Sequence, residues 1–175
     1  GTDKNGATAF SAKCVIVCTG GVTHHEASLS GRPTTNPANQ NQIVYSALKR
    51  LGLERTEEDL FQRQPFGLVE WPDLIPRKCV PETIVNHPVQ ILDKDRERIC
   101  EGLSDRYALT QAMFRAEEQG RTVRSERGEP GLYLTLSDVS PGRLEAEFPN
   151  LHRLLKRSNR LETDVLVFPF LHYHL

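Results

Sequence analysis

The chain has 175 residues, 38% of them hydrophobic, and carries 22 Lys and Arg against 23 Asp and Glu for a net charge of −1. This length allows one domain with a substantial core but not two large domains. The balanced charge excludes sequence-independent binding to nucleic acid, which needs an excess of cations, and no apolar run approaches the ~20 residues of a membrane span.

The cysteine content bears on the cellular compartment. Four cysteines, at positions 14, 18, 79 and 100, are too few and too irregularly spaced for a disulfide framework. The sequence shows no basic-then-apolar start of the kind that marks a secretory signal. We therefore expect reduced thiols and a cytoplasmic location.

The first predicted element is a strand over residues 14–18, Cys-Val-Ile-Val-Cys. Consecutive apolar residues without alternation are typical of a strand buried on both faces, as in the centre of a parallel sheet. Cys14 and Cys18 are accordingly expected in the core. Residues 165–171 form a second apolar run near the other end. Both runs are expected to belong to a larger sheet, and the chain is interpreted as a segment excised from a longer protein.

Between these runs, the next signals are helical and then irregular. Apolar residues at positions 43, 44, 47, 48 and 51 share one helical face, and Gly52 follows as a C-terminal cap. Acidic residues at 57–59 predict another helix start, which Pro65 and Gly67 interrupt. Residues 69–81 contain three prolines and predict irregular structure.

Elements with clearer periodicity follow in the second half of the chain. They are a strand over residues 89–92 with a turn at 93–96, a helix ending at Gly120, a strand over 132–136, and helices over 141–148 and 151–157. Ser104 or Asp105 can cap the first of these helices. Together the elements predict an α/β or α+β class with an irregular, proline-rich centre.

Five short motifs occur in the order found in one flavoprotein family. They are Thr19-Gly20-Gly21 at the end of the first strand, Thr35-Asn36-Pro37, Gln64-Pro65-Phe66-Gly67-Leu68, Asp105-Arg106, and Pro169-Phe170-Leu171-His172-Tyr173. Through these motifs, residues 13–175 resemble the flavoprotein subunit of the succinate dehydrogenase/fumarate reductase family, which includes L-aspartate oxidase. The resemblance implies an α+β fold, as a fragment of an α/β protein. It implies a capping domain over residues 38–163, with the helix that faces FAD at its start. Flanking it would be part of the FAD-binding domain at 1–37 and the start of the returning FAD-binding segment at 164–175.

The resemblance also implies FAD as the cofactor of the full-length parent. The flavin contacts of the family map onto Thr19, Gly20, Gly21 and Asn36. The family's Gly-x-Gly-x-x-Gly fingerprint, which binds the pyrophosphate at a helix N-terminus, and its C-terminal FAD segment have no counterpart in this sequence. We therefore expect that this chain alone does not bind FAD tightly.

The catalytic residues implied by the resemblance are Arg106 and Glu82. In the family, hydride passes between flavin and a small dicarboxylate while an arginine exchanges a proton with the substrate. An arginine does this only in a buried site with a carboxylate that relays protons, because its free pKa lies above about 12. Arg106 matches that arginine and Glu82 its relay, at the family's own separation. Without the resemblance, Arg106 is interpreted as a surface charge near a helix N-terminus and Glu82 as a loop carboxylate.

Substrate binding is implied for three further residues, two of which depart from the family. His172 matches a histidine that binds a substrate carboxylate, and imidazole suits this role because its charge is tunable near neutral pH. Gln64 and Phe66 replace a histidine and a threonine, and Val85 replaces the second arginine of the relay. His172 and His174 are only two potential ligands, so no metal site is predicted.

Three functional interpretations remain open. The first is an FAD-dependent oxidoreductase acting on a small carboxylate or a related activated C–C bond. It would be completed by the missing FAD-binding portions and an electron-transfer subunit, and would be cytoplasmic or peripheral to the membrane through that subunit. The second is a non-catalytic binding or assembly domain derived from a flavoprotein, which the residues at 64, 66 and 85 favour. The third is an unrelated α/β binding domain.

Overall fold

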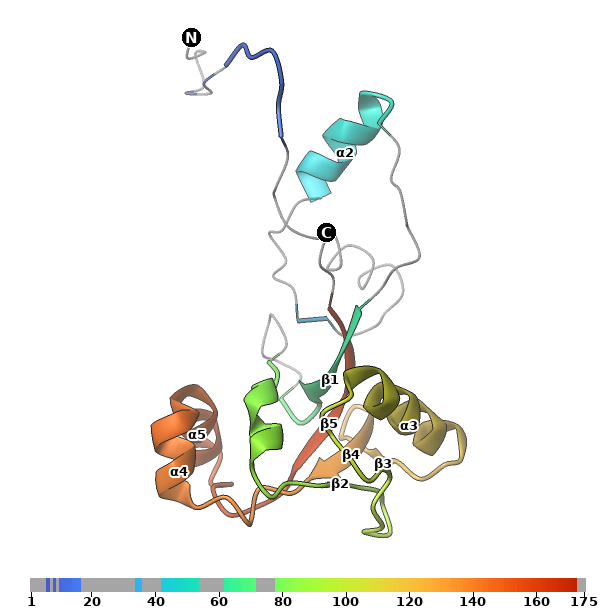
Figure 1. Ribbon diagram of the computed structural model, residues 1–175, viewed down its shortest axis with the longest axis vertical. Helices are drawn as coiled ribbons and strands as arrows, with labels where there is room; N and C mark the ends of the chain where they lie inside the picture. Colours follow the sequence, from blue (N-terminus) through green and yellow to red (C-terminus); the bar gives the residue numbers. More distant parts are fainter. Residues whose placement is uncertain are drawn as a thin grey trace.

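The computed structural model describes residues 6, 8, 10–16, 34–35, 42–53, 62–71 and 78–172. This part of the chain contains both helices and strands (Figure 1). In chain order they are helix α2 (Gln42–Arg50), strand β1 (Gln62–Leu68), the 3-10 helix η1 (Glu82–Asn86), strand β2 (Ile91–Leu92), helix α3 (Arg106–Glu118), strands β3 (Val123–Arg124) and β4 (Pro130–Leu134), helices α4 (Pro141–Glu147) and α5 (Pro149–Arg157), and strand β5 (Val165–His172). The predicted mixed class of helices and strands is confirmed.

A five-stranded antiparallel sheet organises the fold. Its order is β1-β5-β4-β2, and β3 pairs with β4. All residues from 165 to 170 in β5 are buried. Because successive residues of a strand point to opposite faces, both faces of the sheet are covered along β5. Figure 1 shows α3 on one side of the sheet, with η1, α4 and α5 on the other.

A bulge shapes the pairing of β1 with β5. Gln64 pairs with Phe170 and Gly67 with Phe168, so β1 has one residue more than β5 between these pairs. A bulge leaves one residue without a ladder partner, which lets proline occupy a strand, and Pro65 lies here. An added Cβ at Gly67 would lie 2.3 Å from Cδ2 of Phe170. The two residues expected to interrupt regular structure are therefore part of a bulged strand.

Most helices begin and end at the predicted signals. Asp105 is the N-cap of α3 and accepts a hydrogen bond from the Ala108 N–H at 2.9 Å, and Gly120 follows the helix at φ +67. Ser140 caps α4 in the same way at 3.4 Å. The predicted helix before Gly52 is α2, and Gly52 has φ +74. The predicted strand over 132–136 is shifted, because β4 covers Pro130–Leu134.

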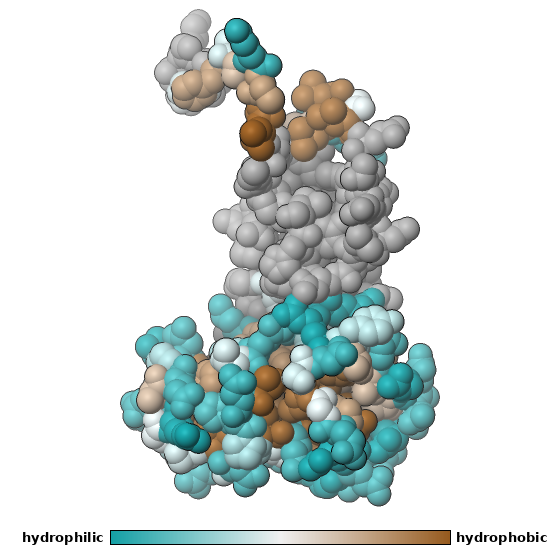
Figure 2. Space-filling view, viewed as in Figure 1, coloured by the Kyte–Doolittle hydropathy of each residue, from teal (hydrophilic) through white to brown (hydrophobic). Residues whose placement is uncertain are grey.

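One core contains buried residues from both sides of the sheet. It includes Leu109 and Met113 of α3, Leu144 of α4, Leu155 of α5 and Val167 of β5, each at most 1% exposed. Figure 2 shows hydrophilic residues over most of this face of the sheet body, with hydrophobic residues emerging at its centre. Among the residues that the structure describes, no helix is long and apolar enough to cross a membrane.

The prediction for the first apolar run is wrong where the structure describes it. Residues 14–16 form no strand, Val15 and Ile16 are 76% and 83% exposed, and Cys14 is an exposed free cysteine rather than a core residue. A strand buried on both faces needs a neighbour on each side, and no described strand pairs with these residues. Cys18 and the helix start expected at 57–59 lie outside the described residues.

Candidate functional site

Arg106 and Glu82 form an ion pair. The Nη2 of Arg106 donates a hydrogen bond to Oε2 of Glu82, and the two residues lie 24 positions apart in the sequence. Their side chains are 36% and 40% exposed, respectively. A hydrogen bond between ionised groups is stronger than a neutral one. The structure therefore brings together the two residues that the resemblance implies for proton transfer.

Each partner is the first residue of an anchored helix. Glu82 begins η1, whose Ile84 is fully buried, and His87, which follows η1, hydrogen-bonds Glu147 of α4 at 3.0 Å. Arg106 begins α3 directly after the N-cap Asp105. A cation at a helix N-terminus meets the positive end of the helix dipole. The nearby carboxylates of Glu82 and Asp105 offset this repulsion.

The helix that carries Arg106 packs on the strand that carries Gln64. α3 contacts both β1 and β5. Phe114 of α3 meets the ring of Phe168 edge-on at 5.5 Å, and the guanidinium of Arg63 lies 4.9 Å from the centre of the Phe114 ring. The Glu82–Arg106 pair and the predicted substrate strand therefore belong to one packed unit.

Gln64 and Phe66 lie in different surroundings on β1. Gln64 is half-buried, and its Oε1 is buried without a hydrogen-bond partner. Phe66 is 2% exposed and belongs to the hydrophobic core. Val85, three residues after Glu82, packs partly buried against the same core. An unpaired buried acceptor costs free energy, so the amide oxygen of Gln64 is an unsatisfied polar atom on β1.

The other predicted site residues are described partly or not at all. β5 places the backbone of His172 opposite Gln62. This pair lies two pairs along the ladder from Gln64–Phe170, with Arg63–Leu171 between them. Thr19, Gly20, Gly21 and Asn36, predicted to contact FAD, lie outside the described residues, as does His174. Their roles stay predictions. No group of three metal-ligating side chains occurs in the part of the chain that the structure describes.

The thiol of Cys79 lies near Glu82 and has a raised pKa. Burial, and secondarily the negative charge of Glu82, raise the pKa of the Cys79 thiol to about 12. The reactive form of cysteine is the thiolate, and this environment disfavours it at neutral pH.

The described residues do not fit the pyrophosphate of FAD. That group is bound by glycine-rich turns between a strand and a helix. Among the described glycines, Gly6, Gly52, Gly120 and Gly128 have positive φ, and none leads from a strand into a helix N-terminus. The described part contains the Glu82–Arg106 ion pair and, on β1, an amide oxygen of Gln64 without a hydrogen-bond partner.

An α+β domain with a buried antiparallel sheet and an Arg–Glu pair is the class that the fold and site define. A family model described as "FAD binding domain" matches residues 2–165. The chain therefore belongs to the FAD binding domain family, and this membership implies FAD in the parent protein. The resemblance to succinate dehydrogenase/fumarate reductase flavoproteins is confirmed at this level.

Solved structures show the same fold. A structure described as "Quinol-Fumarate Reductase with Menaquinol Molecules" matches with a TM-score of 0.54 and 19% identity over 65% of this chain and 22% of that chain. A mutant of E. coli quinol fumarate reductase, FrdA, matches with a TM-score of 0.56 and 18% identity over 67% of this chain and 23% of that one. The chain thus spans less than a quarter of either protein. A search of curated proteins found no match.

Proposed function

We propose that this chain is the capping part of an FAD-dependent oxidoreductase in which Arg106 exchanges a proton with the substrate. Residues 38–163 would form the capping domain, and 1–37 and 164–175 would belong to the FAD-binding domain of the parent. The observation that carries the proposal is the hydrogen bond from Arg106 to Glu82. Family membership and the fold shared with quinol-fumarate reductase support it.

The pair can perform the proton half of a reduction. FAD, when bound in the parent, supplies hydride transfer. Arg106 would donate a proton from its guanidinium to a substrate carbon, and Glu82 would take up a proton from solvent and pass it to the neutral guanidine across the Nη2–Oε2 hydrogen bond. An arginine can act this way only where water is excluded. Both side chains are partly exposed in this chain, so we infer that the FAD-binding portions of the parent close over them.

The substrate is proposed to carry fewer negative charges than a dicarboxylate. His172 would bind one carboxylate of the substrate, and the neutral amide of Gln64 would contact the substrate next to it. Phe66 would support this wall of the site from the core. In the family, the positions of Gln64 and Val85 carry groups that can be cationic. Each charge-assisted hydrogen bond contributes about 1.5–3 kcal/mol. Losing two would weaken dicarboxylate binding by about 3–6 kcal/mol, or about two to four orders of magnitude.

The electron acceptor and location of the parent are inferred from the related structures. One of them is a quinol-fumarate reductase that holds menaquinol molecules. We infer that the parent passes electrons to or from a partner subunit, either in the cytoplasm or at the membrane surface. This chain contributes the closing domain to such an assembly.

A second candidate function is a flavoprotein-derived binding or assembly domain without catalysis. Phe66 is buried in the core, where it packs instead of contacting solvent. Val85 also packs against the core and has no ionisable group. The buried Phe66 is compatible with a lost substrate contact, and the apolar Val85 with a lost proton relay. The Glu82–Arg106 contact favours the catalytic function.

The test uses the full-length parent loaded with FAD. Arg106→Ala should lower kcat for its own substrate by about 10²–10⁴, the usual contribution of a general acid. Arg115→Ala, at an exposed position on the same helix, is the matched control and should leave kcat unchanged. Equal activity of the Arg106→Ala and wild-type proteins would favour the non-catalytic function or another proton donor.

A further inference from the structure

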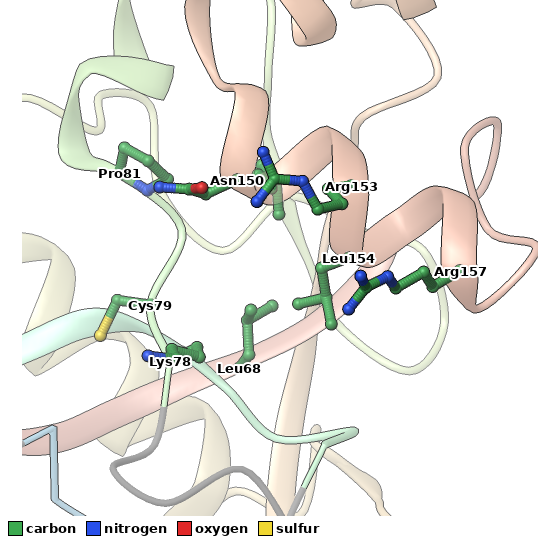
Figure 3. A pocket seen from close by; sticks show the side chains of 9 residues that line it. Leu68, Lys78, Cys79, Pro81, Asn150, Arg153, Leu154 and Arg157 are labelled. Atoms are coloured by element: carbon green, nitrogen blue, oxygen red, sulfur yellow. The ribbon is translucent and has the colours of Figure 1, made fainter.

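A cavity lies between α5 and the residues before η1, from Lys78 to Pro81 (Figure 3). Its volume is about 510 Å³, within the range of about 300–1,000 Å³ for small-molecule sites. Leu68, Leu151 and Leu154 contribute apolar surface to its lining. The cavity can therefore hold an organic molecule with a compact apolar body.

Three cations line the same cavity. Arg153 and Arg157 lie four residues apart on α5 and thus share one helix face. Lys78 comes from the opposite wall, and Figure 3 shows its side chain across the cavity from the two arginines. No Asp or Glu lines the cavity. The Cys79 thiol, also in the lining, stays protonated because burial raises its pKa to about 12, so it adds no negative charge.

These cations also lack carboxylate partners. Within the described residues, no ion pair involves Lys78, Arg153 or Arg157. Elsewhere in the same body, Arg121 and Arg160 both pair with carboxylates. Lys78, Arg153 and Arg157 are all exposed, so each is open to a ligand that arrives from solvent. Three cations in one concavity raise the local concentration of anions.

We propose that this cavity binds an organic phosphate, a phosphate monoester whose apolar body contacts the leucines. A phosphate monoester carries about −1.5 to −2 charges at neutral pH, whereas a carboxylate carries one, so the dianion better matches three cations. The guanidinium forks of Arg153 and Arg157 suit phosphate oxygens in bidentate geometry. The Asn150 amide, also in the lining, can donate a neutral hydrogen bond. This site is separate from the proposed proton transfer and does not depend on it.

The chain contains its own reporter for binding. Trp71 is the one tryptophan of the sequence. Its indole N–H donates a hydrogen bond of 3.0 Å to Oγ of Ser158, and Ser158 directly follows Arg157. A ligand that engages Arg157 is expected to change Trp71 fluorescence. Titration of the 175-residue chain with phenyl phosphate, with calorimetry in parallel, measures the affinity. Two control probes are titrated in the same way: inorganic phosphate, which has the charged group alone, and phenol, which has the apolar ring alone.

Phenyl phosphate should bind saturably and at least about tenfold more tightly than inorganic phosphate or phenol. The double variant Arg153→Gln/Arg157→Gln should weaken it at least about tenfold, and so should Lys78→Gln from the other wall. Arg115→Gln, which removes an exposed helical charge elsewhere, should leave the affinity unchanged. Circular dichroism checks that each variant is folded.

Three outcomes would overturn the proposal. Equal affinity for inorganic and phenyl phosphate would indicate a general attraction of anions to the surface. Equal affinity of the Arg115→Gln and cavity variants would place binding elsewhere. Absence of saturable heat and fluorescence change would exclude an organic-phosphate site.

Discussion

Replacing Gly67 by alanine is expected to destabilise the protein by about 3 kcal/mol, because β1 and β5 pack too closely for a side chain. The added Cβ would lie 2.3 Å from Cδ2 of Phe170 and 2.7 Å from the carbonyl oxygen of Phe168, where ordinary contacts are 3.4–4 Å. Phe170 is 1% exposed, so its ring has no open space to enter. Overpacking costs about 1–3 kcal/mol, and the clash with backbone places Gly67→Ala at the upper end.

The assay is urea unfolding followed by the fluorescence of Trp71. The midpoint for Gly67→Ala should fall by about 1–2 M at an unchanged slope. Gly142→Ala is the matched control, because Gly142 lies within α4 and no atom lies within 4 Å of its added Cβ. This control should be neutral or more stable by up to about 1 kcal/mol. Stability of Gly67→Ala within about 0.5 kcal/mol of wild type would refute the close approach of the two strands.

Three further predictions address the buried carboxylate, a helix cap and the substrate. Asp93 is fully buried; its Oδ1 accepts from the backbone N–H groups of residues 95 and 97 and its Oδ2 from Arg121. Asp93→Asn should therefore cost about 1.5–3 kcal/mol and Asp93→Ala about twice that in urea unfolding. Burial raises the pKa of Asp93, but its hydrogen bonds and Arg121 outweigh burial and lower it. Its contribution to stability is therefore full above its unfolded pKa of about 3.9 and is lost as pH falls below that value, so Asp93→Asn should flatten the acid limb of a stability–pH curve. Asp105→Ala should cost about 0.5–2 kcal/mol, because the Ala108 N–H loses its cap, and unchanged stability would show that solvent replaces the cap. In steady-state assays the FAD-loaded parent should turn over succinate and fumarate poorly relative to less charged substrates, and efficient fumarate reduction would contradict the substrate proposal.

Helices α2, α3, α4 and α5 and the turn after β2 could be predicted because their signals are local, whereas η1 was not predicted. Asp105 and Ser140 cap their helices through side-chain bonds three residues away, and Gly52 and Gly120 take the positive φ that ends a helix. Such features depend on neighbours in sequence and need no knowledge of the fold. Their positions therefore agree with the prediction to within a few residues.

Long-range features could not be predicted in the same way. β1 contains Pro65 and Gly67, whose local preferences oppose a strand, and it forms only because β5 supplies a partner and the bulge accommodates the proline. Residues 14–16 show the opposite case, since their apolar character predicts a strand but no described strand pairs with them. Strand formation depends on pairing as well as on composition.

The candidate site also contains features that could be predicted from the sequence and features that could not. The motif resemblance anticipated the contact between Glu82 and Arg106. It did not anticipate that Phe66 is a core residue. The cavity of Lys78, Arg153 and Arg157 was also missed. The four-residue spacing of the two arginines signals one helix face, but no pattern in the sequence indicates that Lys78 lies across from them.

The central claim is that Arg106 and Glu82 act together in proton transfer, and a double-mutant cycle on kcat of the FAD-loaded parent tests it most directly. Arg106→Ala, Glu82→Gln and the double variant would be compared with wild type on the parent's own substrate, with rapid flavin reduction measured separately. Residues that act as one unit have strongly non-additive effects. We predict that the double variant loses no more activity than Arg106→Ala alone. Losses that add in free energy, or full activity of Glu82→Gln, would show that Arg106 and Glu82 do not act as one proton-transfer unit.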